Sequence, residues 1–365
     1  METNQLFALM SHFDLPGEPT AVLELKSGNI NATFRVTMEG AGTKQDFILQ
    51  RINTYVFREP QRMMENIVSV TDHLRRALQR LGEDTERSVL RVIPTKDGQL
   101  MYTDDTGCWR VYPFIADAFA YDAVDAAAFL EVGRGFGRFQ RLLADYPADQ
   151  LFESIPDFHN TAVRYAQLDE AIRRDAAGRA DEVQPEIAFL MERREALCGI
   201  LPLIENGTLP LRVTHNDTKS NNVMLDKATG KALCVIDLDT VMPGSVLFDY
   251  GDAIRFGAST APEDEPDTSK IALDLQKTEA FTRGFVQETN GFLTQDEMRL
   301  LPFGIEVITA EMAMRFLADY LNGDIYFKTD TADHNLRRAR AQITLLRDTE
   351  GKREKLREMM KKLIK

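Results

Sequence analysis

The sequence predicts an α+β protein with two lobes, the first rich in strands and the second mostly helical. The chain has 365 residues, which exceeds what one simple hydrophobic core serves. Short β-branched and aromatic runs, separated by glycine-containing turns, occupy the chain up to about residue 115, and helical periodicity dominates after it. Because strands and helices are segregated rather than alternating, α+β is favoured over a parallel α/β sheet. We place the lobes at 1–114 and 115–365.

The first lobe begins with a short amphipathic helix at 4–13. Strands are expected at 20–25, 32–38, 45–52, 88–93, 99–102 and 108–114. A long helix separates the first three strands from the rest. Glu59 and Pro60 open it, because proline suits the first turn, and Gly82 ends it.

The second lobe is predicted to be helical around one β-like island at 211–241. The helices are expected at 123–143, 158–177, 183–205, 278–289, 294–321 and 334–346. Segment 261–269 is acidic and rich in proline, which indicates a surface loop. The basic, periodic tail at 352–365 is interpreted as a solvated terminal helix rather than a binding patch.

Composition excludes several classes of function. The net charge of −13 disfavours nucleic acids and anionic membranes as partners, although divalent cations would still let a nucleotide bind. Cys108, Cys198 and Cys234 fit neither a metal motif nor a disulfide framework, so a reduced, cytoplasmic protein is expected. No apolar stretch approaches the ~20 residues that span a bilayer, and the N-terminal residues lack the pattern of a secretory signal.

The island at 211–241 carries the candidate chemistry. Its apolar runs 223–225 and 232–236 are joined by a glycine-containing turn and should pair as an antiparallel hairpin. This hairpin would bring Asn222 and Asp237 to the same open end, and Asp217 lies one short loop earlier. A carboxylate, a carboxamide and a second carboxylate are therefore expected to converge.

These three side chains suit phosphoryl transfer. Mg²⁺ prefers oxygen ligands and usually takes one or two protein carboxylates, with phosphate oxygens filling much of its shell. Asn222 and Asp237 fit that role, which leaves Asp217 to accept the proton of an attacking hydroxyl. The alternative is that Asp and Asn stand here only because they favour turns.

The pattern His215-x-Asp217-x-x-x-x-Asn222, followed by the hairpin and Ile-Asp237-Leu-Asp, resembles the aminoglycoside phosphotransferase and choline kinase-type branch of the kinase superfamily. The resemblance implies a bilobal protein-kinase-like fold and Mg-ATP as co-substrate. It implies Asp217 as the catalytic base, Asn222 and Asp237 as magnesium ligands, and His215 as a scaffold for the loop. Asp249 would brace the loop through hydrogen bonds to its backbone.

The same resemblance places a phosphate-covering loop at Ser27, Gly28 and Asn29, between two predicted strands. In the third strand, Gln50 stands where such kinases place a phosphate-pairing Lys or Arg. The neighbouring Arg51 faces the opposite side of a regular strand.

Further nucleotide contacts follow from the resemblance. Glu65, early on the long helix, would be the partner carboxylate of the cation on the third strand, and the alternative is a solvated helix residue. Tyr112 and Phe114 lie at the lobe connection, where the adenine hinge is expected.

A closer resemblance, to the bacterial N-acetylhexosamine 1-kinases, runs through nearly the whole chain. It rests on segments 47–53, 64–67, 213–219, 234–244, 250–258 and 315–327. These enzymes phosphorylate the anomeric hydroxyl of GlcNAc or GalNAc, and Gln50 would then be a trait of the subfamily. Asp239, Thr240, Arg315 and Tyr326 are the candidate sugar contacts. Alternatively, Arg315 pairs with Glu311 on one helix face and Tyr326 is a core or rim aromatic.

Three rival functions are compatible with parts of this pattern. A kinase of another small hydroxyl compound, such as choline, homoserine or an aminoglycoside, would use the same chemistry. A protein kinase is disfavoured, because the sequence has no Asp-Phe-Gly and no long activation segment between Asp239 and Asp249. A non-catalytic nucleotide-binding protein is favoured only by Gln50. The oligomeric state stays open.

Overall fold

The structure, a computed structural model, describes residues 2–25 and 31–364. The chain divides into two compact units. The first comprises Met1–Phe119, Gln150–Pro156 and Met224–Met242, and the second comprises Ala120–Asp149, Asp157–Val223 and Pro243–Lys365. The first unit thus includes two segments from beyond residue 114, among them most of the predicted hairpin.

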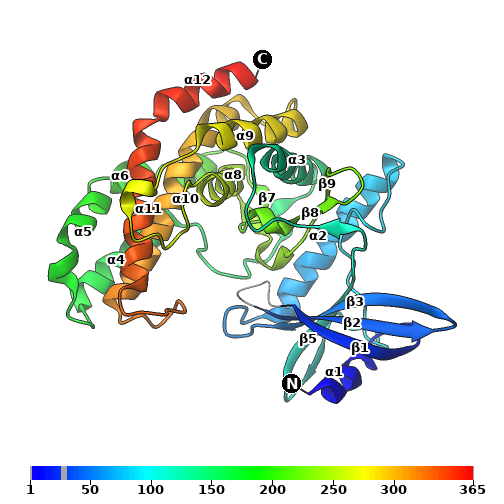
Figure 1. Cartoon of the computed structure of the whole chain (residues 1–365). Coiled ribbons are helices and arrows are strands. Elements are labelled where there is room, and N and C mark those ends of the chain that lie inside the picture. Colours follow the sequence, from blue (N-terminus) through cyan, green and yellow to red (C-terminus); the bar gives the residue numbers. More distant parts are fainter. Residues whose placement is uncertain (1, 26–30, 365) are drawn as a thin grey trace. The chain divides into compact units, whose positions relative to one another are not determined.

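A five-stranded antiparallel sheet forms the frame of the first unit, in the order β1-β2-β3-β5-β4 (Figure 1). Its strands are β1 (Glu18–Leu25), β2 (Ala32–Gly40), β3 (Thr43–Ile52), β4 (Tyr102–Asp104) and β5 (Gly107–Pro113). One face and helix α1 (Thr3–Met10) share an apolar core that includes Val36, Leu49 and Val111. Because side chains alternate along a strand, Gln50 and Arg110 lie on the other face, and they are direct partners in the β3–β5 register.

Helix α2 (Pro60–Arg80) confirms the long helix predicted in the first lobe. Its buried stripe includes Met64, Ile67, Val70 and Leu74 at helical spacing. Gly82 follows the C-cap in a left-handed conformation, which glycine adopts without the cost borne by other residues.

The strand predicted at 88–93 is wrong. This segment forms only an isolated bridge between Ile93 and Val111. Pro94 follows and has no N–H to extend a ladder, and its carbonyl instead accepts the N–H of Asp14. The strand predicted at 99–102 is displaced and appears as β4.

The predicted hairpin is confirmed as β8 (Val223–Asp226) and β9 (Ala232–Val235). β6 (Ala118–Phe119) adds a third strand beside β8. Gly230 takes a left-handed conformation in the turn, and its N–H donates to the carbonyl of Asp226. The turn thereby fixes the strand that leads directly to Asp237.

Helices make up most of the second unit. The longer ones are α3 (Ala126–Leu142), α4 (Thr161–Arg174), α8 (Val246–Gly257), α9 (Leu275–Thr289), α10 (Gln295–Leu321), α11 (His334–Gly351) and α12 (Arg353–Leu363). The single helix predicted at 183–205 is wrong, because α5 (Gln184–Met191), α6 (Arg194–Leu197) and α7 (Ile200–Glu205) replace it. Pro185 and Pro202 begin or lie in two of these pieces, and proline lacks the N–H that a continuous helix needs. Helix α8 was not predicted.

Two glycines let α8 pack closely on α10. A Cβ at Gly251 would lie 2.2 Å from the carbonyl oxygen of Gly304, and a Cβ at Gly304 would lie 2.1 Å from that of Leu247. Neither position therefore has room for a side chain. This contact holds the helix that carries Asp249 and Asp252.

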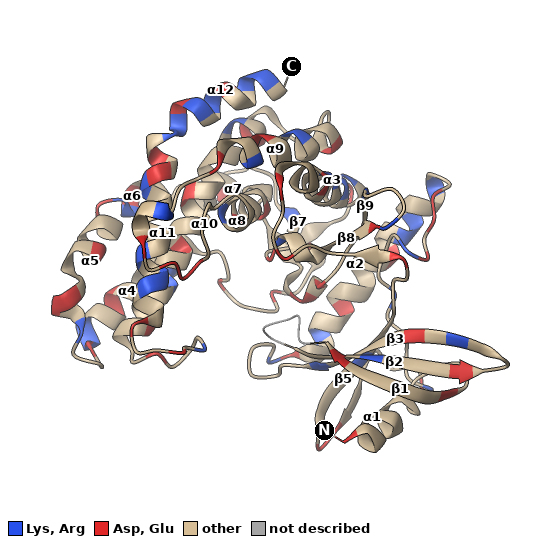
Figure 2. Cartoon of the chain, viewed as in Figure 1, with Lys and Arg blue, Asp and Glu red and all other residues tan. Residues whose placement is uncertain are grey.

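The basic tail forms α12, as predicted. Leu356 and Met360 are its buried residues, and Lys and Arg line much of the rest of the helix (Figure 2). Within the part of the chain that the structure describes, none of the helices has the length and apolarity to cross a membrane.

Candidate active site

Asp249 of α8 anchors the loop that carries Asp217 by hydrogen bonds to its backbone. The two oxygens of this buried carboxylate accept the backbone N–H groups of His215, at 2.9 Å, and Asn216, at 2.8 Å. Gln140 of α3 donates to the same carboxylate at 2.8 Å. Asn216 is left-handed, with φ 63°, which asparagine tolerates better than most residues. The bracing role that the resemblance implied for Asp249 is therefore present in the structure.

Asp217 and Asn222 lie together in the second unit. Nδ2 of Asn222 donates to the backbone oxygen of Asp217 at 2.8 Å and to its Oδ2 at 3.3 Å. The Asp217 carboxylate is part-exposed, as a base that meets a substrate must be. Asp237 belongs to the other unit, so its convergence with these two residues stays a prediction.

Lys219 is a member of this group that the sequence analysis missed. Its Nζ lies 2.8 Å from Oδ1 of Asp217. Burial opposes the charge on Lys219, but the carboxylates of Asp217 and Asp252 hold its pKa above the ordinary value. The available signal was its position two residues after the base, inside the recognised motif.

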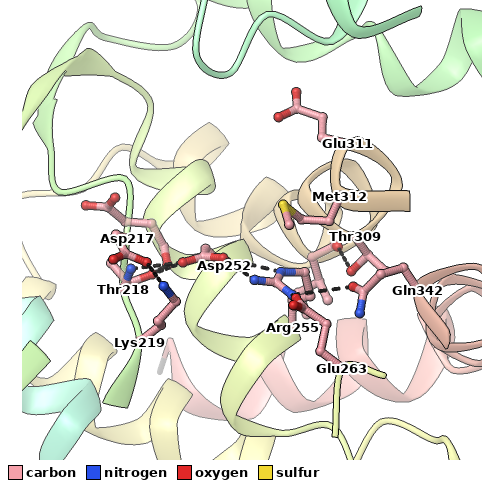
Figure 3. Close-up of polar contacts among 12 residues, drawn as sticks. Asp217, Thr218, Lys219, Asp252, Arg255, Glu263, Thr309, Glu311, Met312 and Gln342 are labelled. Carbon is pink, nitrogen blue, oxygen red and sulfur yellow. Dashed lines mark hydrogen bonds and ion pairs between the residues drawn. The ribbon is translucent and has the colours of Figure 1, made fainter. Parts of the chain in front are cut away.

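A buried ion chain extends from the loop through α8 (Figure 3). Asp252 accepts the N–H of Thr218 at 2.9 Å and an Arg255 donor at 2.9 Å. Burial alone would raise the pKa of Asp252, but Arg255 and Lys219 keep it below the ordinary value. Arg255 also pairs with Glu263 at 2.7 Å, which gives a structural role to part of the predicted surface loop.

The first unit contributes Asp237 and Asp239, directly after β9. Asp237 is left-handed, with φ 61°, and caps the short helix η4 (Leu238–Thr240). Asp239 is buried and accepts Nδ2 of Asn31 at 2.7 Å. Ser154 donates to its backbone oxygen at 3.1 Å. Thr240 is buried at the end of the same turn.

Gln50 meets Arg110 rather than a carboxylate. Its Oε1 accepts Nε of Arg110 at 3.0 Å and Nη2 at 2.9 Å, and its Nε2 donates to Thr33 at 3.1 Å. Nη1 of Arg110 lies 2.5 Å from Oδ1 of Asp239. Burial opposes the charge on Arg110, but Asp239 raises its pKa above the ordinary value.

The other predicted nucleotide contacts are scattered. Ser27, Gly28 and Asn29 lie outside the described residues. Glu65 is exposed and accepts a hydrogen bond from Gln61 at 3.2 Å, so the structure does not pair it with Gln50.

The predicted hinge residues differ in their surroundings. Tyr112 is buried, and burial raises the pKa of its hydroxyl. The N–H of Phe114 donates to the carbonyl of Asp46 at 3.0 Å, so this group is already used within the first unit.

Arg315 and Tyr326 are neighbours in the second unit. The Arg315 guanidinium lies 5.8 Å from the ring centres of Tyr326 and Phe158. The alternative pairing with Glu311 is not what the structure shows, because Glu311 contacts His159 at 2.8 Å and Thr161 at 2.6 Å. Tyr326 is 54% exposed and is therefore not a core residue.

The candidate magnesium ligands offer oxygen atoms only. The amide nitrogen of Asn222 is used by Asp217, so its amide oxygen is the atom that would meet a cation. Among the described residues, no group of three or more His, Cys, Asp or Glu side chains could hold a metal. A magnesium ion needs no such group where phosphate and water complete its shell, and the oxygens of Asp237 in the first unit and of Asn222 in the second are of the kind that Mg²⁺ binds.

Solved structures share this architecture over almost the whole chain. The aminoglycoside phosphotransferase of Alicyclobacillus acidocaldarius is 12% identical, with 98% of this chain and 96% of that chain covered and a TM-score of 0.59. Choline kinase of Cryptosporidium parvum is 11% identical, with 98% of this chain and 99% of that chain covered and a TM-score of 0.60. Spectinomycin phosphotransferase, in complex with ADP and spectinomycin, is 12% identical, with 96% of this chain and 99% of that chain covered and a TM-score of 0.55. Identities this low show the fold, which is the predicted α+β protein-kinase-like fold.

The sequence itself also matches a family. Residues 21–285 match the phosphotransferase enzyme family, APH. This span contains most of β1, all of β2 to β9, the loop with Asp217 and Asn222, and the bracing helix α8. The match covers well over half of the chain, and the chain belongs to the phosphotransferase enzyme family.

Proposed function

We propose that this chain is an ATP-dependent kinase that phosphorylates a hydroxyl group of a small molecule. The observation that carries the proposal is the geometry around Asp217. Its carboxylate is part-exposed, contacts Lys219 and Asn222, and sits on a loop whose backbone is held by two buried carboxylates of α8. Mere folding does not require a carboxylate in this setting, whereas a positioned base does.

In the proposed reaction, the substrate hydroxyl transfers its proton to the carboxylate of Asp217. The hydroxyl oxygen forms a bond to the γ-phosphorus of ATP, and the bond to the bridging oxygen breaks with its electron pair leaving on ADP. Lys219 orients Asp217 and balances its charge at 2.8 Å. Asn222 and Asp237 would hold Mg²⁺, which when bound neutralises charge on the phosphates.

The proposed substrate is an N-acetylhexosamine, phosphorylated on its anomeric hydroxyl. The resemblance of six segments, from 47–53 to 315–327, supports this choice. Asp239, Thr240, Arg315 and Tyr326 remain the proposed sugar contacts. The ion pair of Asp239 with Arg110 leaves the other three as the simpler candidates.

The charges in the second unit favour a neutral sugar over a cationic substrate. Burial and the nearby charge of Arg315 together keep the pKa of Arg164 below its ordinary value. The positive charge of Arg315 at the proposed sugar contacts would repel an ammonium group such as that of choline. The rings that could cover such a cation already lie around Arg315, at 5.3 Å for Phe327.

The test is a substrate panel with purified protein and Mg-ATP. The acceptors are GlcNAc, GalNAc, glucose, galactose, choline, homoserine and kanamycin, and ADP release is the readout. We expect the two N-acetylhexosamines to react fastest, with ³¹P NMR showing coupling of the product phosphate to the anomeric proton. Faster turnover of choline or homoserine would move the proposal to that substrate. Absence of ADP release with every acceptor would remove the kinase proposal itself.

A further inference from the structure

A buried polar cluster occupies the face of the first sheet that is opposite the apolar core. Gln50 on β3 and Arg110 on β5 are its direct cross-strand partners, and Asp239 completes it from the turn after β9. The Arg110 side chain is 1% exposed. A guanidinium is charged at any pH at which proteins fold, so this position holds a permanent buried cation.

Gln50 is a neutral residue at the strand position where the related kinases were expected to carry a cation. The contacts of Arg110 give a physical reason for this change. A lysine at position 50 would bring a second cation against a guanidinium whose Nε and Nη2 point at this side chain. The amide of Gln50 instead accepts both donors and is itself fixed by Thr33. The sheet therefore keeps one cation here and places it on β5 rather than on β3.

The carboxylate that partners this cation also differs from Glu65, the one that the resemblance implied. The α2 side chain that meets Arg110 is Met64, at 3.7 Å, and Glu65 points to solvent. The partner is Asp239, two residues after the proposed magnesium ligand Asp237. The charge of Asp237 is also felt at Arg110, where it contributes to the raised pKa. The cation thus lies beside the turn that would hold the metal–phosphate end of the nucleotide.

From this arrangement we infer that Arg110 binds the phosphate chain of the nucleotide, with Gln50 as its positioning residue. The inference rests on the proposed kinase function and deepens it. Arg110 presents a planar set of donors suited to phosphate oxygens, and Gln50 fixes the plane of that set. Asp239 balances the charge of Arg110 before the nucleotide binds.

The test compares the affinity of the full chain for ADP and for adenosine by calorimetry, in the presence of Mg²⁺. The ratio of the two affinities isolates the contribution of the phosphates. Arg110→Met is expected to lower this ratio about 10- to 100-fold with adenosine affinity retained, the usual value of a charge-assisted contact. Arg51→Met is the matched control, because Arg51 is the next residue to Gln50 along β3, is exposed, and lies near Gly107 rather than Arg110. The ratio of ADP affinity to adenosine affinity should not change in Arg51→Met.

Two further variants keep the test decisive if Arg110→Met does not fold. Arg110→Lys retains a charge opposite Asp239 but has no planar fork, and we expect a ratio roughly three- to tenfold below the parent. The exchange variant Gln50→Lys/Arg110→Gln returns the cation to β3. Its ratio of ADP affinity to adenosine affinity should be higher than that of Arg110→Gln alone. An unchanged ratio in Arg110→Met or Arg110→Gln, or a loss in Arg51→Met instead, would overturn the inference. A parent protein that binds ADP no better than adenosine would instead count against the proposed function.

Discussion

Two buried arginine–aspartate pairs lie beside candidate site residues, one pair in each unit, and they differ in how their charge is balanced. In the second unit, Arg255 contacts Asp252 at 2.9 Å and Glu263 at 2.7 Å. In the first unit, Arg110 contacts Asp239 at 2.5 Å, and its other strong contacts go to the neutral amide of Gln50.

The difference separates a cation used for structure from one suited to a ligand. Arg255 contacts two carboxylates, and one of them, Asp252, also accepts a hydrogen bond from the backbone N–H of Thr218. Arg110 contacts one carboxylate and a neutral amide, so fewer negative charges surround it than surround Arg255. The second-unit pair thus fixes the loop that carries Asp217, the proposed base, while phosphate binding is the role proposed for the first-unit arginine.

The largest effect should come from Asp217, the residue that the second-unit pair serves to position. Asp217→Asn keeps the shape and the contact with Asn222 but removes the proposed proton acceptor. We expect kcat for the best acceptor of the panel to fall about 10²–10⁴-fold, with ADP affinity changed little. A parallel loss of ADP binding would mean that Asp217 acts on the nucleotide and not as the base.

The two regions also differ in how far the sequence could predict them. The loop with Asp217 and Asn222 was predicted because its residues are close together in sequence and form a motif. Arg110 was missed because its partner Gln50 lies 60 positions away and comes into contact only when β3 and β5 pair. Glu65 was assigned by its place on the helix, but its outward orientation depends on how α2 packs. The segment at 88–93 has the composition of a strand, and Pro94 prevents the ladder.

Removing the cation of the second-unit pair should destabilise the protein more than removing a surface cation. Arg255→Met leaves the buried carboxylate of Asp252 without its main partner, which typically costs 3–5 kcal/mol. Urea unfolding at pH 7 measures this loss. Arg173→Met is the control, because the Arg173–Glu170 pair is exposed and such pairs contribute about 0–1 kcal/mol. Equal losses in the two variants would show that the ion chain along α8 is not what holds this region.

A variant at the close contact between α8 and α10 would test whether the placement of the α8 backbone supports the loop that carries Asp217. Gly251→Ala introduces a Cβ that would lie 2.2 Å from the carbonyl oxygen of Gly304, so the helices must separate. We expect a loss of about 1–3 kcal/mol in the free energy of unfolding, as for overpacking elsewhere. Activity should fall with it, because α8 carries both bracing carboxylates. Gly351→Ala, at the end of α11 where a Cβ meets nothing within 4 Å, should be neutral or slightly stabilising.

The smallest expected effect is on the pH dependence of stability, and it contrasts Asp252 with Asp249 on the same helix. The pKa of Asp252 is below its ordinary value because Arg255 and Lys219 outweigh burial, so its contribution is present above about pH 4 and is lost as pH falls further. Burial raises the pKa of Asp249, so its ionisation removes stability as pH rises through that higher value.

Urea unfolding between pH 3 and pH 7 would resolve the two contributions as slopes of at most about 1.4 kcal/mol per pH unit each. Asp252→Asn should flatten the loss of stability on the acid side, and Asp249→Asn should flatten the fall on the way to neutral pH. The slope is the readout, because both variants also lower the absolute stability by disturbing buried hydrogen bonds. If Asp252→Asn left the acid slope unchanged, the Arg255 pair would not be setting the charge of this carboxylate. The contrast between Arg255, which contacts two carboxylates, and Arg110, which contacts one, would then lose its physical basis.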